Sequence, residues 1–244
     1  TTEFFMTNKN ILIIGSSGGI GKAFANFYNK DANNKVIGLS RSQEDFNTLL
    51  YANHYIDLEK ENTIEDAATS VTKHGPFQLI IVASGILHGE NFAPEKSYKH
   101  ISAESFKKIL NINTIGPALV GKSFIPLLDK HNPSVLAFLS ARVGSISDNR
   151  LGGWHAYRSS KASLNMLIKN FSLELKRTNK QAKVIGLHPG TVDSKLSKPF
   201  QKNVEESKLF SPEFSAEAMA RVIDNTKQED TGSVLAFDGS TIKS

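Results

Sequence analysis

Residues 10–21 read Asn-Ile-Leu-Ile-Ile-Gly-Ser-Ser-Gly-Gly-Ile-Gly, and this stretch decides the fold. It opens with a continuous apolar run, which is typical of a strand buried on both faces of a parallel sheet. The run ends at Gly15, and apolar residues then recur at helical spacing from Gly19 to Lys30. The stretch therefore predicts a buried strand, a glycine turn and a helix.

The glycines of the turn are spaced Gly-x3-Gly-x-Gly, and each has a physical reason to stand there. Gly15 permits the tight turn, Gly19 would let the backbone approach a pyrophosphate, and Gly21 would let the helix lie close to the strand. The free N–H groups at the start of the helix then face an anion. We predict a dinucleotide-binding turn, with a plain tight turn as the alternative. The predicted contacts are Gly15, Ser17, Gly19, Ile20 and Gly21.

The end of the second apolar run, residues 35–39, indicates which dinucleotide is bound. An NAD-binding protein places an Asp or Glu there, where it holds the ribose 2′-hydroxyl. This chain has Ser40 and Arg41 instead, and its next acids are Glu44 and Asp45. An arginine pairs with a 2′-phosphate, and a serine can hydrogen-bond to it. We therefore predict NADP(H) rather than NAD(H), with a solvated surface arginine as the alternative.

Apolar runs and amphipathic segments continue to alternate along the rest of the chain. We expect further strands at residues 52–58, 77–83, 134–140, 182–187 and 234–237. We expect helices at residues 59–74, 104–129, 157–178 and 216–227, the second of them broken near Gly116. This order predicts an α/β fold of Rossmann type, with a doubly wound, mostly parallel sheet. Residues 1–244 are predicted to form one domain, and the irregular loop at 193–215 suits a substrate lid.

Composition excludes several classes of protein. Of the 244 residues 39% are hydrophobic, as in a globular chain, and there is no cysteine for disulfides or thiolate chemistry. The net charge of +5 comes from scattered lysines, so we predict no nucleic-acid partner. The longest apolar stretch, residues 79–83, is too short to cross a membrane. We see no signal-peptide pattern and no cluster of metal ligands, and we predict a cytoplasmic protein.

Tyr157 and Lys161 are four residues apart in the long predicted helix, so they share one helix face. A free tyrosine has a pKa of about 10, which is too high for ready proton exchange at pH 7. A nearby lysine cation favours the phenolate and is expected to lower the tyrosine pKa. Such a tyrosine gives a proton to a developing alkoxide or takes one from an alcohol. For the isolated pair, an exposed helix face is the alternative.

Together these motifs resemble the short-chain dehydrogenase/reductase family over nearly the whole chain. The matching segments are Gly15–Gly21, Asp57–Leu58, Asn113, Tyr157–Lys161 and His188–Val192. The subgroup that the chain resembles is that of the C-factor-like and sniffer-like carbonyl reductases. The residues that carry this second resemblance are Ser140–Ile146, Gly152, Gly153 and Trp154.

The resemblance implies roles for the matching residues. Tyr157 is the expected acid/base, Lys161 lowers its pKa and holds the nicotinamide ribose, and Asn113 positions a water that relays protons to Lys161. The other implied cofactor contacts are Asp57 and Leu58 at the adenine, Ala83, Ser84 and Gly85 after the fourth strand, and Pro189, Gly190, Thr191 and Val192 at the nicotinamide, with Ser194 or Thr191 reaching its carboxamide or phosphate. The alternatives are a turn residue for Asp57 and a helix kink or cap for Asn113.

Two segments depart from the family pattern. Residues 82–85 read Val-Ala-Ser-Gly where the family often has Asn-Asn-Ala-Gly, although Gly85 still permits a close approach of the cofactor. The family's catalytic serine lies three residues before a glycine, and here that position is Ala141. Ser140 and Ser145 are the candidates for the substrate-orienting hydroxyl, and we favour Ser140. Because adjacent side chains on a strand face opposite sides, either choice requires a bulged strand end.

We predict an enzyme that transfers a hydride between NADP(H) and the carbonyl carbon of a small or medium aldehyde or ketone, with Tyr157 supplying the proton. The alternative is a non-catalytic nucleotide-binding sensor or signalling protein of the same fold, which Ala141 leaves open. The helices at 104–129 and 157–178 carry apolar stripes, and the resemblance implies a homodimer or homotetramer, because such helices often form a dimer interface in this family. Trp154 is expected either to wall the substrate pocket or to pack in the core.

Overall fold

In the computed structural model, which describes residues 8–42 and 50–244, eight strands form one central sheet. In their order across the sheet these are β3 (Ala52–Tyr55), β2 (Lys35–Ser40), β1 (Asn10–Ile14), β4 (Leu79–Val82), β5 (Ser134–Leu139), β6 (Ala182–His188), β9 (Val234–Ala236) and β10 (Thr241–Ile242). Neighbouring strands run parallel except for β9 and β10. The predicted doubly wound, mostly parallel sheet is therefore confirmed.

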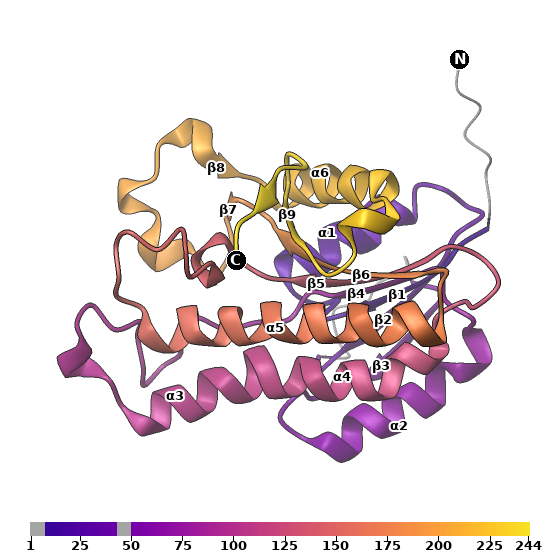
Figure 1. Cartoon of the computed structure of the whole chain (residues 1–244), viewed down its shortest axis with the longest axis horizontal. Helices are drawn as coiled ribbons and strands as arrows, with labels where there is room; N and C mark the ends of the chain where they lie inside the picture. Colours follow the sequence, from indigo (N-terminus) through magenta and orange to yellow (C-terminus); the bar gives the residue numbers. More distant parts are fainter. Residues whose placement is uncertain (1–7, 43–49) are drawn as a thin grey trace.

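Helices cover both faces of this sheet (Figure 1). One face carries α2 (Glu61–Val71), α3 (Ala103–Leu110), α4 (Gly116–Phe124) and α5 (His155–Thr178), and the other carries α1 (Gly19–Tyr28) and α6 (Pro212–Asn225). Strand β1 shows how one apolar run serves both layers. Leu12 and Ile14 belong to the core beneath α2, α4 and α5, whereas Ile11 and Ile13 pack with α1 and α6. Successive side chains point to opposite faces, so a strand in this position must be apolar throughout.

Some element boundaries differ from the predicted ones. α5 begins at His155 rather than Tyr157, and α6 begins at Pro212, inside the segment predicted as a loop. The strand expected at residues 52–58 ends at Tyr55. The start of α6 follows from a local cap, because Ser211 Oγ accepts from Phe214 N and Pro212 stands at the first helical position, and apolar spacing alone does not report such a cap.

The helix predicted at residues 104–129 does break near Gly116. The break is a π-helical turn, Asn111–Ile115, between α3 and α4, and such turns are frequent at functional sites. The predicted loop at 193–215 also contains regular structure. Its elements are a 3₁₀ helix at Lys198–Asn203, another at Glu206–Lys208, and strand β8 (Leu209–Phe210), which pairs with β7 (Thr191–Val192).

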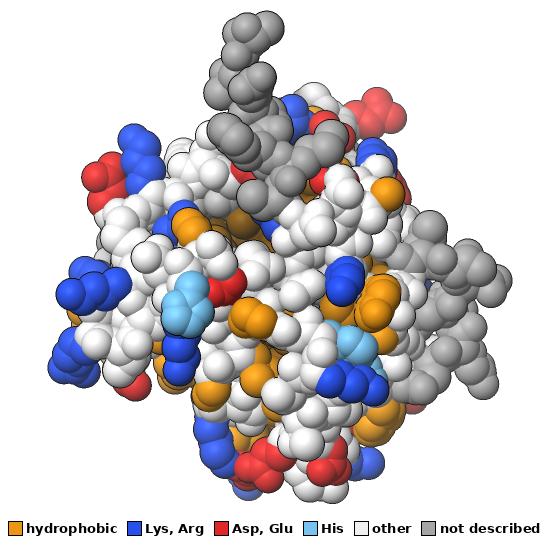
Figure 2. Space-filling model, turned by 90° about the vertical axis from the view of Figure 1, so that its right-hand side faces the viewer, with side chains coloured by type: hydrophobic (Ala, Val, Ile, Leu, Met, Phe, Trp, Pro, Cys, Tyr) orange, Lys and Arg blue, Asp and Glu red, His pale blue; other side chains and the backbone are white. Residues whose placement is uncertain are grey.

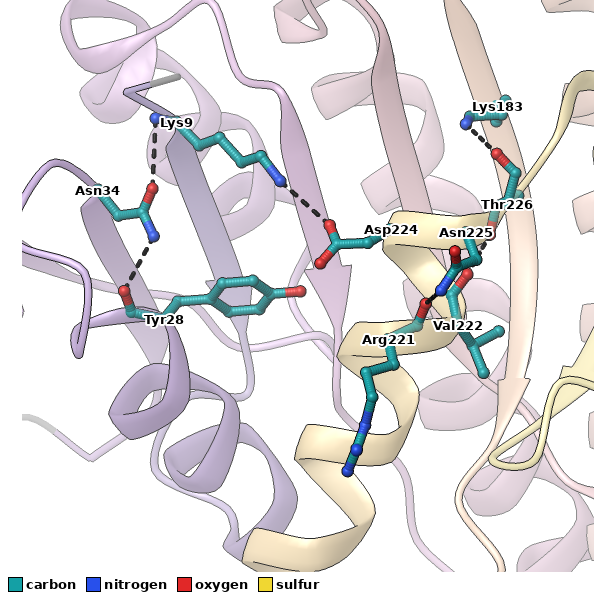
Figure 3. A network of polar contacts seen from close by, with 9 residues as sticks. All are labelled: Lys9, Tyr28, Asn34, Lys183, Arg221, Val222, Asp224, Asn225 and Thr226. Carbon is teal, nitrogen blue, oxygen red and sulfur yellow. Dashed lines mark hydrogen bonds and ion pairs between the residues drawn. The ribbon is translucent and has the colours of Figure 1, made fainter. Parts of the chain in front are cut away.

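Polar contacts tie the elements together at the amino ends of the strands (Figure 3). Lys9 Nζ, just before β1, forms an ion pair of 3.1 Å with Asp224 Oδ1 on α6. Asn34 Oδ1 accepts from Lys9 N at 3.4 Å, and Asn34 Nδ2 donates to the carbonyl of Tyr28, the last residue of α1, at 3.0 Å. Lys183 of β6 donates to the carbonyl oxygen of Thr226, beyond α6. These contacts fix α1 and α6 at the amino ends of β1 and β6.

Figure 2 shows the face of the molecule at which α5 ends, and there basic and acidic side chains are interspersed. Across residues 8–42 and 50–244, no helix has the length and hydropathy that a membrane span requires.

Candidate active site

The glycine turn has the geometry that its spacing predicts. Gly15 adopts φ +87°, a left-handed conformation that favours glycine, and a Cβ at Gly21 would lie 2.2 Å from the Gly15 carbonyl oxygen. α1 can therefore begin directly against the turn. The atoms nearest to a Cβ at Gly19, on Ser194 and Pro212, would be 3.9 Å away, so the backbone there is open to a ligand.

A pocket opens beside this turn, at the carboxyl ends of β1, β2 and β4. The strand order reverses here, and ligands of doubly wound sheets bind at that point. The predicted cofactor residues that line the pocket are Gly15, Ser17, Ser40, Arg41, Asp57, Leu58, Ala83, Ser84 and Gly85. The lining residues that sequence reasoning missed are Gly18, Ile56, Glu59, Ile86 and Ile112. Each of them is adjacent in sequence to a residue predicted for the site, and this adjacency is the signal that would have found them.

The rim of the pocket carries the residues expected at the adenosine end. Arg41 is exposed, and within residues 8–42 and 50–244 it has no ion-pair partner. The Ser40 hydroxyl donates to the Ser42 carbonyl oxygen at 2.5 Å, so its proton is already engaged. Asp57 Oδ1 accepts from the backbone N–H of Glu59 at 3.1 Å. The exposed guanidinium of Arg41 is thus a cation at the rim of the pocket, where it could meet a phosphate.

Tyr157 and Lys161 both lie buried on the inner side of α5. Lys161 Nζ is 5.8 Å from the centre of the Tyr157 ring and donates to the Leu139 carbonyl oxygen at 2.9 Å. Burial raises the pKa of Tyr157 and lowers the pKa of Lys161 to about 8. The predicted lowering of the tyrosine pKa is therefore wrong for this structure, because removal of the phenolate from water outweighs the effect of the lysine.

Asn113 connects α5 to the segment that follows β4. Its Oδ1 accepts from Ile86 N at 2.8 Å, and its Nδ2 donates to the Ile86 carbonyl at 2.8 Å and to Ser160 Oγ on α5 at 3.1 Å. A Cβ at Gly85 would lie 3.4 Å from Lys161 Nζ and 3.5 Å from Asn113 Oδ1. Gly85, Asn113 and Lys161 thus meet at one point, although sequence separates them widely.

The two serine candidates have different partners. Ser140 is buried, and its hydroxyl donates to Asn165 Oδ1 on α5 at 2.5 Å. Ser145 is also buried, and its Oγ accepts from Asp148 N at 3.1 Å, which leaves the hydroxyl proton of Ser145 available. Sequence reasoning missed Asn165. It lies four residues after Lys161 and eight after Tyr157, so extending the same helix face would have found it.

The segment at residues 189–194, expected at the nicotinamide, follows β6. Gly190 has φ +76°, and a Cβ there would lie 2.7 Å from the Phe210 ring. The Pro189 carbonyl accepts from Ser215 Oγ at 2.7 Å. The segment is therefore tied to β8 and α6, and its Ser194 end lies beside the glycine turn.

Aromatic rings extend from Tyr157 toward the predicted lid. The Trp154 ring centre is 6.2 Å from that of Tyr157 and 5.2 Å from that of Phe200. The His88 ring lies 5.7 Å from Phe200, and His88 Nε2 is 3.1 Å from the Lys195 carbonyl oxygen. Trp154 thus joins the predicted acid to the segment at 193–215, which favours a pocket wall over core packing.

Comparisons with known proteins agree with these observations. The family model described as short chain dehydrogenase matches residues 9–205. An uncharacterized oxidoreductase of Schizosaccharomyces pombe is 28% identical over 260 residues, which cover 97% of this chain and 98% of that protein. The C-signal protein of Myxococcus xanthus is 31% identical over 135 residues, which cover 55% of this chain and 76% of that protein.

Solved structures show the same fold. The NADPH-bound carbonyl reductase from chicken fatty liver superposes with a TM-score of 0.84 at 22% identity, covering 98% of this chain and 100% of that one. The carbonyl reductase Sniffer of D. melanogaster superposes with a TM-score of 0.82 at 19% identity, with the same coverage of 98% and 100%.

Proposed function

The chain belongs to the short chain dehydrogenase family of oxidoreductases, and we propose that it is an NADP(H)-dependent reductase of small or medium aldehydes and ketones. The observation that carries the proposal is the buried pair of Tyr157 and Lys161, which meets Asn113 and Gly85 beside the pocket of the glycine turn. A pure nucleotide-binding protein has no chemical need for this set.

The donor groups of the pocket fit NADP(H). Gly15 and Gly21 fill the turn so closely that a side chain at either would collide with backbone or with Ser84, and the open backbone at Gly19 suits a pyrophosphate. Arg41 would pair with the 2′-phosphate, and Asp57 and Leu58 would hold the adenine. Residues 189–194 would line the nicotinamide. When bound, the cofactor supplies the hydride that the carbonyl carbon receives.

Tyr157 would give its proton to the carbonyl oxygen. Because burial raises the Tyr157 pKa, the phenol keeps its proton at neutral pH and is available as an acid. Lys161, with a pKa of about 8, can then return a proton to the tyrosine, and Asn113 would hold the water that resupplies Lys161. These properties favour carbonyl reduction over alcohol oxidation.

Ser140 remains our candidate for orienting the carbonyl. Its hydroxyl has one proton, which Asn165 Oδ1 receives in this structure, so Ser140 must exchange that partner for the substrate. If Ser140→Ala keeps wild-type turnover while Ser145→Ala loses it, Ser145 holds the role instead.

The second candidate function is a non-catalytic nucleotide-binding sensor of the same fold. Two observations favour it. Ala141 stands in the position of the family's serine, and the Ser140 hydroxyl already donates to Asn165 Oδ1.

Consumption of NADPH and NADH against a panel of aldehydes and ketones tests the proposal, with Tyr157→Phe beside the wild type. We expect turnover with NADPH that falls about 100- to 10,000-fold in the variant. No turnover by a folded protein that still binds NADPH would support the sensor function.

We further propose that the chain acts in the cytoplasm as a homodimer or homotetramer. Ile115, Met166 and Leu173 expose 50%, 61% and 45% of their surface on the outer side of the helices that carried the predicted apolar stripes. Light scattering on a size-exclusion column checks the assembly.

A further inference from the structure

The backbone takes an unusual path just before the catalytic helix. Gly152, Gly153 and Trp154 follow one another with φ of +62°, +68° and +50°. Trp154 is the non-glycine residue with a positive φ in the described chain, and such a conformation costs about 1–2 kcal/mol in an L-residue. The strained residue lies three positions before Tyr157, so something must hold the turn in place.

Glu95, from the loop between β4 and α3, is the residue that holds it. Its carbonyl oxygen accepts from Trp154 N at 2.6 Å, and its carboxylate Oε2 accepts from Ala156 N at 3.3 Å. A Cβ at Gly153 would lie 3.3 Å from the same carbonyl oxygen. One residue therefore contacts both the strained turn and the first turn of α5.

The carboxylate of Glu95 takes the place of a missing helix cap. A capping side chain normally accepts from the second or third N–H of a helix. Trp154 stands at the cap position of α5 and makes no such hydrogen bond, because an indole has no acceptor oxygen. Ala156 N is the second N–H of α5, and a carboxylate near a helix start is also favoured by the helix dipole. Glu95 thus supplies the cap from a position 61 residues away in sequence.

Glu95 is buried although its burial does not favour the free energy of unfolding. Only 3% of its surface is exposed, and its Oε1 finds no hydrogen-bond partner among the described residues. A buried carboxyl oxygen without a hydrogen-bond partner lowers the free energy of unfolding. Such a group is expected at a functional site, where it holds other residues in the geometry that function requires.

We propose that Glu95 is a positioning residue of the reductase: it braces the turn at 152–154 and thereby sets the placement of Tyr157 and of the Trp154 wall. This inference rests on the proposed function. Tyr157 follows Ala156 directly, and its ring packs edge-on against Trp154. Loss of the brace would let the turn relax, which would move both rings relative to the substrate while leaving the cofactor pocket intact.

Three substitutions separate the features of Glu95. Glu95→Gln keeps the length and an acceptor oxygen, Glu95→Asp keeps the charge but shortens the reach, and Glu95→Met keeps the size without an acceptor. Glu90→Met is the matched control, because Glu90 is exposed in the same loop. Each variant is measured for kcat and KM with the carbonyl, for the Kd of NADPH, and for intrinsic fluorescence. Trp154 is the single tryptophan of the chain, so its emission reports on the braced turn directly.

We expect Glu95→Gln to stay within about threefold of wild-type kcat, and Glu95→Met to lose about 10- to 100-fold, since misplacement of a catalytic group by about 1 Å has effects of that size. Glu95→Asp should fall between them. The Kd of NADPH should not change. Trp154 emission should shift to longer wavelength and become easier to quench in Glu95→Met, but not in Glu95→Gln or Glu90→Met.

The proposal is overturned if Glu95→Met keeps wild-type kcat and emission, or if Glu95→Gln is as impaired as Glu95→Met. If Glu95→Met does not fold, the proposal is tested by the other two variants. It requires a higher kcat for Glu95→Gln than for Glu95→Asp, and the reverse order overturns it. Failure of the proposed function is a separate result: the wild type then reduces no carbonyl, while the fluorescence comparison still tests Glu95.

Discussion

Two groups of buried ionisable side chains lie at opposite ends of the strands, which we call the amino edge and the carboxyl edge of the sheet. The charged form is favoured at the amino edge and disfavoured at the carboxyl edge. At the amino edge, the Asp129 carboxylate accepts from the N–H groups of His131 and Asn132 at 2.8 and 3.0 Å and from Gln78 Nε2 at 2.7 Å. These hydrogen bonds hold the pKa of Asp129 well below its usual range. At the carboxyl edge, burial disfavours the charged forms of Tyr157 and Lys161, which have few such partners.

The difference distinguishes a group that stabilises the fold, Asp129, from two groups that we propose are retained for chemistry, Tyr157 and Lys161. Hydrogen bonds that favour a buried charge contribute to the free energy of unfolding. Burial that disfavours a charge reduces it, and such groups persist where function requires them. Substitutions at the amino edge should therefore lower the free energy of unfolding, and substitutions at the carboxyl edge should lower activity.

The largest effect is expected for Lys161→Met. Activity should fall about 1000-fold, because Tyr157, the proposed acid, loses the group that we propose returns its proton. The free energy of unfolding at pH 7 should stay the same or rise, because the variant no longer buries an ammonium group. Steady-state kinetics and urea denaturation measure the two quantities, and a clear loss of stability would contradict the assignment of Lys161 to the costly cluster.

The pH dependence of this variant follows from the lysine pKa. The pKa of Lys161 is about 8 in the folded protein and 10.5 for an ordinary lysine, so the unfolded chain binds more protons between these pH values. The wild type should then gain stability relative to Lys161→Met as pH rises through that window, and the carbonyl reductase activity should decline above pH 8 as Lys161 loses its proton.

Asp129→Ala should show the converse pattern. Four donor groups lose a buried acceptor, which is expected to lower the free energy of unfolding by about 3 kcal/mol, while kcat of the folded variant stays near wild type. The pKa of Asp129 is lower in the folded protein than in the unfolded chain. Its contribution to the free energy of unfolding is therefore present above the unfolded pKa and is lost as pH falls toward the folded pKa. Asp66→Ala, at an exposed site on α2, is the control. A change in kcat without a change in stability would break the comparison.

Arg41→Ala tests whether an exposed group at the carboxyl edge also acts through function alone. We expect the KM for NADPH to rise about 10-fold or somewhat more, with little change for NADH and none in stability, because only the 2′-phosphate loses a partner. Arg177→Ala, exposed at the far end of α5, provides the matched control. Equal losses with both cofactors would refute the predicted NADP(H) preference.

The smallest effect is expected for Lys9→Met. The ion pair with Asp224 is partly exposed, with side chains 36% and 39% accessible, and such pairs contribute about 1 kcal/mol or less. Denaturation in low and high salt should show a small difference that salt removes. A large loss in the free energy of unfolding that salt does not change would mean that this ion pair stabilises the fold as much as Asp129 does.

Much of the fold was predictable from local pattern. The apolar run of β1 and the glycine turn suffice to predict a strand buried on both faces and a helix that starts against it. Gly15 has the left-handed conformation of a tight turn, and Gly21 allows the expected close approach of α1. The spacing of Tyr157 and Lys161 places both on one face of α5. These features depend on neighbours in sequence, where backbone geometry is sufficient.

Contacts between distant segments were not predictable in the same way. The Glu95 cap of α5 joins residues that are 61 apart, and the Ser140 hydrogen bond to Asn165 joins residues that are 25 apart. Neither pair has a periodic signal, because its geometry exists only after the loop after β4 and the end of β5 pack against α5.

The sequence by itself determined the alternation of strands and helices, the turn that suits a dinucleotide, and the residue types available for proton transfer. Only the tertiary structure decided the state of those residues. Spacing alone suggests that Lys161 lowers the Tyr157 pKa, whereas the structure raises it. The reason is that desolvation depends on every element packed around a group, and a sequence lists the group without its surroundings.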